Sequence, residues 1–149
     1  MPRITQFDQL TPAQMRCLTH LADGLTYFGA ACALHIKVDT FRTHMRHIRR
    51  KWGNGSSATL VHRAYATGQV ALPEAIEAPV VFDAAELRLW KAVAEHPSPS
   101  EIAQALGMVR GDARKAVYAL LDKAGAKTEP HLVKIGHQYG LLSGPEPRR

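Results

Sequence analysis

Apolar residues recur at every third or fourth position through most of the chain, in runs separated by short polar turns. This period is typical of amphipathic helices that pack on a core. No run alternates between apolar and polar residues for long enough to predict a strand. The pattern therefore predicts an all-α fold built from eight short helices.

Capping residues mark where these helices begin. Thr11-Pro12-Ala13-Gln14 is a capping box with proline at the first helical position, and residues 83–86 and 98–101 repeat the capping box. Glycines mark where several of the helices end, as C-terminal caps commonly do. The longest helices are expected over about 39–52 and 112–124. The first is followed by a helix over about 57–67, and the second by a helix over about 130–139.

The chain contains an internal repeat. Residues 10–70 align without a gap to residues 82–142, with ten identical pairs and a matched apolar pattern. Each copy contains four predicted helices. The expected architecture is two tandem four-helix domains, 1–72 and 80–149, joined by a short linker at about 71–81.

Basic residues are concentrated in the first repeat. Residues 1–72 contain nine Lys and Arg against three Asp and Glu, whereas residues 73–149 contain ten of each sign. The net charge of +6 therefore lies in the first repeat, and residues 40–73 contain no acidic residue. Such a segment favours a polyanionic partner, nucleic acid rather than a membrane, although a solvated helix face has the same composition.

The second and third helices of each repeat are separated by a turn of three or four residues, as in helix-turn-helix DNA-binding domains. In the first repeat, Phe41, Met45 and Ile48 are expected to form the buried face of the third helix. The outward positions are Arg42, Thr43, Arg46, Arg49 and Arg50. Because an α-helix fits the major groove and arginine can bond O6 and N7 of guanine together, this face predicts contact with DNA bases.

Several short motifs follow one another in the first repeat. They are Leu10-Thr11-Pro12, Ala22-x-Gly24-Leu25, Thr40-Phe41-Arg42-Thr43-His44, Ile48, Arg50-Lys51-Trp52-Gly53 and Ser56-Ser57. In combination they resemble the LuxR-type helix-turn-helix domain of bacterial transcription regulators, over residues 10–72. The resemblance implies base contacts by Arg42, Thr43 and Arg46. It also implies phosphate contacts by Lys37, Arg49, Arg50, Lys51 and Ser57.

The first repeat departs from the LuxR-type pattern at the turn. His35 stands where the family usually has glycine, and histidine tolerates a positive φ better than most residues. Lys37 replaces the usual Ser or Thr cap, which leaves Asp39 as the expected cap of the third helix.

The second repeat has a weaker DNA-binding pattern. Arg114, Lys115 and Tyr118 stand at the base-contacting positions and are the candidate DNA contacts of this repeat. Leu121 and Asp122 stand where the first repeat has two arginines, and neither side chain attracts phosphate. We therefore expect the second repeat to mediate homodimerisation or to contact a protein partner. The alternative is a monomer that uses both repeats on one asymmetric DNA site.

Other classes of site find little support. Cys17-x-x-His20 and Cys32-x-x-His35 have metal-like spacing, but Cys17 falls on a core position, so no metal is expected. The histidines do not form a set with a nucleophile and an acid, and the sequence has no phosphate-binding glycine loop, so no enzyme activity, cofactor or small-molecule substrate is expected. The two cysteines and the absence of an apolar signal or membrane-spanning run indicate a cytoplasmic protein.

These features together predict a sequence-specific DNA-binding transcriptional regulator, with double-stranded DNA as its partner and no membrane contact. The alternative is a protein-interaction regulator that binds RNA polymerase or another regulator and has only non-specific affinity for DNA.

Overall fold

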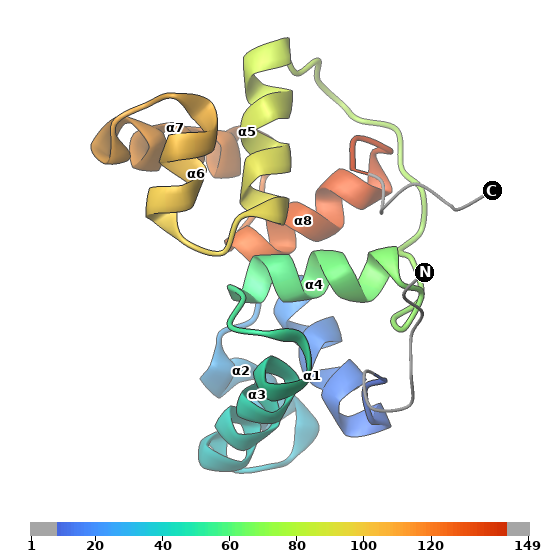
Figure 1. The fold of residues 1–149 in the computed structure, drawn as a ribbon. Helices are drawn as coiled ribbons and strands as arrows, with labels where there is room; N and C mark the ends of the chain where they lie inside the picture. The colour runs from blue at the N-terminus through green and yellow to red at the C-terminus, as the bar shows by residue number, and fades with distance from the viewer. Residues whose placement is uncertain (1–8, 143–149) are drawn as a thin grey trace, which may run out of the picture.

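The computed structural model describes residues 9–142, and this part of the chain is all-helical, as predicted (Figure 1). Its helices are α1 (Pro12–Ala22), α2 (Tyr27–Leu34), α3 (Val38–Trp52), α4 (Ser57–Ala66), α5 (Ala84–Glu95), α6 (Pro99–Leu106), α7 (Arg110–Ala124) and α8 (Glu129–Gln138). The outer ends of the two expected domains, 1–8 and 143–149, lie outside the described residues.

Two of the three predicted capping boxes form, at the start of α1 and α5. At the start of α6 only half of the box forms, because the Ser98 hydroxyl accepts from the Glu101 amide at 3.2 Å but the Glu101 side chain does not accept from the Ser98 amide. The Gln14 amide donates to Thr11 Oγ1 at 3.1 Å, and the Thr11 amide donates to Gln14 Oε1 at 3.0 Å. Asp83 and Glu86 make the same reciprocal pair. These bonds satisfy backbone donors that the first helical turn leaves without a partner.

Helices α3 and α7 begin earlier than the sequence predicted. Their N-cap residues are Lys37 and Val109, and neither makes a side-chain capping bond. The prediction that Asp39 caps α3 is wrong, because the Lys37 carbonyl already accepts from the Phe41 amide at 3.0 Å. Asp39 lies within the first turn instead, where its carboxylate accepts from Arg42.

The turn between the second and third helices has the same geometry in both repeats. His35 adopts the left-handed conformation with φ 60° and ψ 40°, and Gly107 occupies the equivalent place with φ 66° and ψ 31°. The next amide bonds back to the preceding helix in each case, from Ile36 to Ala31 and from Met108 to Ala103. This αL cap sets the direction in which α3 and α7 leave the turn.

The predicted core faces are buried. Phe41, Met45 and Ile48 of α3 are at most 1% exposed. Trp52 and Trp90 are also buried, as predicted for core residues, and the Trp90 indole donates to the Leu132 carbonyl at 2.8 Å.

The two repeats differ at one matched pair of core positions. Trp90 of α5 and Gly136 of α8 occupy the places of Leu18 and Ala64 in the first repeat. The larger side chain on α5 is therefore accompanied by the smaller residue on α8. This exchange is consistent with a core packed to constant volume.

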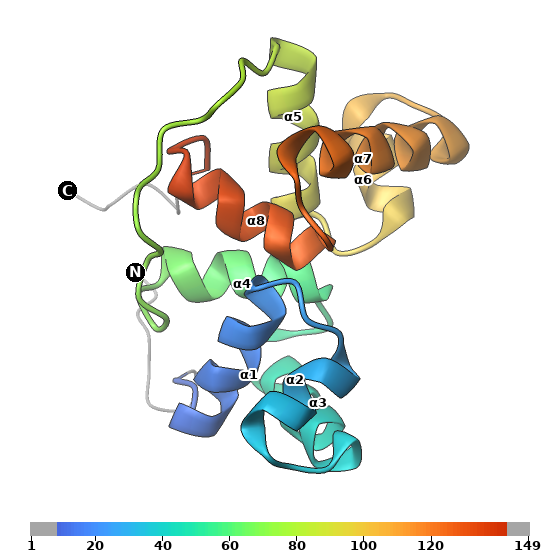
Figure 2. The ribbon, with the colours of Figure 1, turned by 180° about the vertical axis from the view of Figure 1, so that it is seen from behind.

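The fourth helices hold the two repeats together. Helix α4 packs along α8, α8 also contacts α1, and α4 also contacts α5. The buried apolar residues of both repeats consequently form one continuous hydrophobic cluster. In Figures 1 and 2, α1–α3 lie on one side of the α4–α8 pair and α5–α7 on the other.

Two histidines lie in this contact. His62 Nδ1 and His137 Nε2 are 2.9 Å apart, and the His137 ring also lies against Tyr65. Burial, together with the proximity of His62, lowers the pKa of His137 to about 4. Burial also lowers the pKa of His62, opposed by the negative charge of Glu95.

We therefore expect acid to weaken the contact between the repeats. Since the unfolded chain binds protons on these histidines near pH 6.5 and the folded chain does so only at lower pH, the free energy of unfolding should fall as pH drops from about 6.5 to about 4. Allowing for partial exposure, the His137 contribution should be about 1–2 kcal/mol. Urea denaturation across this range should show a shallower decline for His137→Gln. The exposed His47→Gln control should match wild type, and equal slopes for all three proteins would contradict the prediction.

Gly136 offers a direct test of the matched packing. A Cβ at this position would lie 2.6 Å from Trp90 Nε1 and 2.6 Å from Leu142 Cδ1. We expect Gly136→Ala to lower the free energy of unfolding by about 1–3 kcal/mol, because the rigid indole has to move. Gly111→Ala in α7 meets no atom within 4 Å and should be neutral or stabilising by up to about 1 kcal/mol. Thermal or urea denaturation compares the two, and a harmless Gly136→Ala would refute this account of the core.

Candidate nucleic-acid interface

The three predicted base-contacting residues lie together on the outer face of α3. Arg46 is exposed, and the Arg42 side chain is 57% exposed. Thr43 is half-buried and its hydroxyl donates to the Asp39 carbonyl at 3.0 Å. Arg42 donates from Nη1 to Asp39 Oδ1 at 3.1 Å, which holds its guanidinium along the helix. Phe41, Met45 and Ile48 are buried on one side of the helix, so the face that carries Thr43 and Arg46 points away from the core, with Arg42 at its edge.

The predicted phosphate-contacting residues fall into two groups. Lys37 and Arg50 are exposed, and Ser57 is half-buried in the first turn of α4. Arg49 and Lys51 instead bond to the chain itself. Arg49 donates from Nε to the Gly55 carbonyl at 3.0 Å and from Nη1 to the Tyr27 hydroxyl at 3.3 Å.

Lys51 anchors the other side of the same helix. Its Nζ donates to the Gln9 carbonyl at 2.7 Å and to Gln14 Oε1 at 3.0 Å. Gln14 therefore serves the α1 capping box and the α1–α3 contact together. The sequence showed Gln14 as a cap but gave no sign of this second role, because Lys51 lies 37 residues away.

The arginines of α3 border a shallow cleft. Arg42, Arg46, Arg49 and Arg50 line it together with Met45, Tyr27 of α2 and Asn54 of the following loop, and its volume is about 520 Å³. The acidic residues within 9–72 are Asp23 and Asp39, and Asp23 bonds to Lys134 of the second repeat. Asp39 therefore offsets only part of the positive charge of α3, and the cleft suits an anionic ligand.

The equivalent surface of α7 is weaker in charge and more apolar. Arg114 and Lys115 are exposed, and Tyr118 is 57% exposed. The Arg114 guanidinium carbon lies 5.8 Å from the Tyr118 ring centroid, and Arg114 Nε donates to the Tyr118 hydroxyl at 3.4 Å. Lys123, nearer the end of α7, pairs with Glu86 of α5 at 2.9 Å.

The structure does not assemble the cysteine–histidine pairs. Cys17 is fully buried in the core, where burial raises the pKa of its thiol to about 11, while Cys32 is exposed on α2. Within residues 9–142, no three His, Cys, Asp or Glu side chains lie close enough together to hold a metal ion. The helices of this region are also too short or too polar to cross a membrane.

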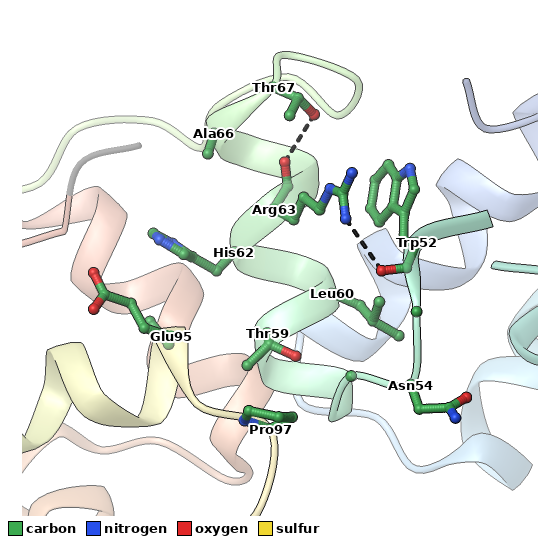
Figure 3. A pocket seen from close by; sticks show the side chains of 13 residues that line it. Trp52, Asn54, Thr59, Leu60, His62, Arg63, Ala66, Thr67, Glu95 and Pro97 are labelled. Carbon is green, nitrogen blue, oxygen red and sulfur yellow. Dashed lines mark hydrogen bonds between the residues drawn. The ribbon is translucent and has the colours of Figure 1, made fainter. Parts of the chain in front are cut away.

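A cavity that the sequence did not indicate lies between the repeats. It has a volume of about 700 Å³ and is bordered by α4 and by the end of α5 (Figure 3). Arg63 lies over the Trp52 ring at 4.9 Å and donates to the Trp52 carbonyl at 3.1 Å, whereas His62 and Glu95 lie on the other side. The sequence could not locate this cavity because its walls come from both repeats.

Comparison with protein-family models found no match to this chain. Comparison with the curated proteins and with the solved structures also found no match. The function is therefore inferred from the side chains of α3 and from their arrangement.

The two arginines at the end of α3 should differ in their effect on stability. Arg49→Met removes the bonds to Gly55 and Tyr27, and we expect it to lower the free energy of unfolding by about 1–2 kcal/mol. Arg50→Met makes the same substitution at an exposed site and should change the free energy of unfolding by less than about 0.5 kcal/mol. Chemical denaturation measures both, and equal losses would show that Arg49 has no positioning role.

Proposed function

We propose that this chain is a sequence-specific DNA-binding transcriptional regulator that contacts base edges in the major groove through α3. The observation that carries the proposal is the placement of Arg42, Thr43 and Arg46 on one outward face of a helix whose opposite face is buried. An α-helix of this kind fits the major groove. In Figure 1, α3 lies at the end of the molecule farthest from α5–α7, where a duplex can approach it.

The bases are contacted chiefly by the two arginines. The planar fork of Arg42 or Arg46 matches the O6 and N7 acceptors of guanine. Arg42 first has to exchange its bond to Asp39 for the base, and this exposed ion pair is worth little in water. The exchange therefore costs little, and Asp39 orients the guanidinium before DNA arrives.

Phosphate contacts fix the position of α3 in the groove without selecting a sequence. Lys37 precedes α3, Arg50 follows the base-contacting face, and Ser57 lies in the first turn of α4, where backbone amides favour an anion. Arg49 and Lys51 support this arrangement by fixing α3 to α2, to α1 and to the loop after α3.

The resemblance of the first repeat to LuxR-type domains supports the same function. The proposal includes a cytoplasmic location, since the protein then has access to bacterial DNA, and it includes no catalytic step or cofactor. The second candidate is a regulator that binds RNA polymerase or another protein and has only non-specific DNA affinity. The observation in its favour is the pair of exposed apolar side chains Phe28 and Val109, which are 68% and 67% exposed.

Fluorescence anisotropy with a duplex selected from a random library tests the proposal. Arg42→Ala or Arg46→Ala should weaken binding to the selected duplex by about 1–3 kcal/mol and relax the preference at one base pair. Arg50→Ala should weaken all duplexes alike and reduce the slope of log affinity against log salt by about 0.9.

Arg16→Ala, which removes an exposed arginine of α1, is the matched control and should bind like wild type. If Arg42→Ala and Arg46→Ala bind the selected duplex as wild type does, α3 does not contact the bases. A selection that enriches no sequence would favour the second candidate.

A further inference from the structure

The contact between a fourth helix and the first helix of the other repeat occurs twice, once on each side of the α4–α8 pair. Helix α8 packs on α1 and, in the equivalent arrangement, α4 packs on α5. Lys134 of α8 bonds to Asp23 at the end of α1. The equivalent residues of the other contact, 72 positions away, are His62 of α4 and Glu95 of α5. Burial lowers the pKa of His62 and the negative charge of Glu95 opposes this shift, so these two residues also interact.

A symmetrical contact between two similar units relates all their parts by the same rotation. The segments that follow α1 and α5 are consistent with this relation, because Gly24 lies close to His131 of α8, and Pro97, one residue after the counterpart of Gly24, lines the same cavity as Thr59 of α4. Thr59 and His131 are themselves 72 residues apart. These corresponding contacts indicate that an approximate two-fold rotation relates the two repeats within one chain.

This symmetry presents both third helices on one side of the molecule. In Figure 1, α7 lies to the left of α4 and α8, α3 lies below the left part of α4, and both α4 and α8 begin on the left. The segment that connects the repeats runs on the opposite side, and the view from behind in Figure 2 agrees. The connecting segment therefore leaves the side that carries α3 and α7 open.

We propose that a single chain binds one duplex through both third helices, with the Arg114–Lys115 face of α7 contacting a second major groove beside the one that α3 contacts. The proposal rests on the proposed function and adds a second DNA contact, its partner surface and the stoichiometry. The face of α8 that could pair with another chain already packs on α4 within the same chain.

The separation between the third helices is set by the helices that lie between them. Helix α3 packs on α1, which contacts α4 and α8, and α8 contacts α7. These three contacts, at about 8–10 Å each, place the axes of α3 and α7 up to about 24–30 Å apart, and each helix, at 15 residues and about 22 Å long, extends beyond its point of contact. Successive major grooves on one face of a duplex are about 34 Å apart.

The chemistry of α7 makes the second contact weaker than the first. Arg114 stands at the position of Arg42, and Lys115 adds a second exposed cation beside it. Tyr118 offers a hydroxyl and a ring edge to a phosphate or a thymine methyl group. Asp122, at the far end of the helix, repels phosphate, so the DNA site is asymmetric, with one strong half and one weak half.

The mass of the complex and its footprint test this proposal on the full chain and the selected duplex. Native mass spectrometry should show one chain per duplex, and hydroxyl-radical footprinting should show protection on two successive turns. Arg114→Ala and Lys115→Ala should each weaken binding about five- to tenfold and remove protection from the weaker turn alone. Lys91→Ala, the loss of an exposed lysine from α5, should leave affinity and footprint unchanged.

A change in DNA spacing tests the rigid connection. Five base pairs inserted between the two protected turns rotate the second by about half a turn. Because the repeats share one core, the insertion should weaken binding as much as Arg114→Ala does, and the two changes together should have no greater effect.

A complex with two chains per duplex would overturn the second contact. An affinity that Arg114→Ala and the insertion leave unchanged, while Arg42→Ala still lowers it, would do the same. Both results would leave the proposed function intact. Insensitivity to Arg42→Ala, Arg46→Ala and Arg114→Ala together would overturn both.

Discussion

Helices α4 and α8 pack along each other through the middle of the molecule, and the positions of the two helix-turn-helix units depend on this contact. Each of the two helices also covers the first helix of the other repeat. The resulting hydrophobic cluster runs through both repeats without a break. Each repeat therefore stabilises the other, because part of the surface of each fourth helix is buried against helices of the other repeat.

Helix α3 combines anchoring and exposed cationic side chains within four turns. Its apolar face is buried, and Arg49 and Lys51 are bonded to neighbouring elements. Arg42, Arg46 and Arg50 remain exposed to solvent. Fixing the helix on three sides gives the exposed side chains a defined position, so that less ordering is required when a ligand binds.

The two repeats share the order of their helices and the turn between the second and third, and they differ in charge. The αL turn at His35 and Gly107 and the unbonded caps of α3 and α7 are common to both. The cations that α3 presents to solvent are partly replaced in α7 by an acid and by aromatic and aliphatic side chains. The two repeats therefore present surfaces of unequal positive charge, joined by one continuous hydrophobic cluster.

The local structure could be predicted from neighbouring residues along the chain. The helical period, the capping boxes at Thr11 and Asp83, and the burial of Phe41, Met45 and Ile48 were all predicted, because each depends on residues within one or two helical turns. The outward placement of Arg42 and Arg46 follows from the same period. The start of α3 was misplaced, because the backbone bond from Phe41 to Lys37 forms without a side-chain cap.

The exposure of each cation and the contact between the repeats depend on residues that are far apart in the chain. Arg49 and Lys51 have the same charge as Arg50, but their partners, Tyr27 and Gln14, lie 22 and 37 residues away. The His62–His137 contact joins residues 75 positions apart. The sequence pattern identifies the apolar face of each fourth helix, but it does not show whether that face packs against another chain or against the fourth helix of the other repeat. In this structure α4 packs on α8 of the same chain, and this packing fixes the relative positions of α3 and α7.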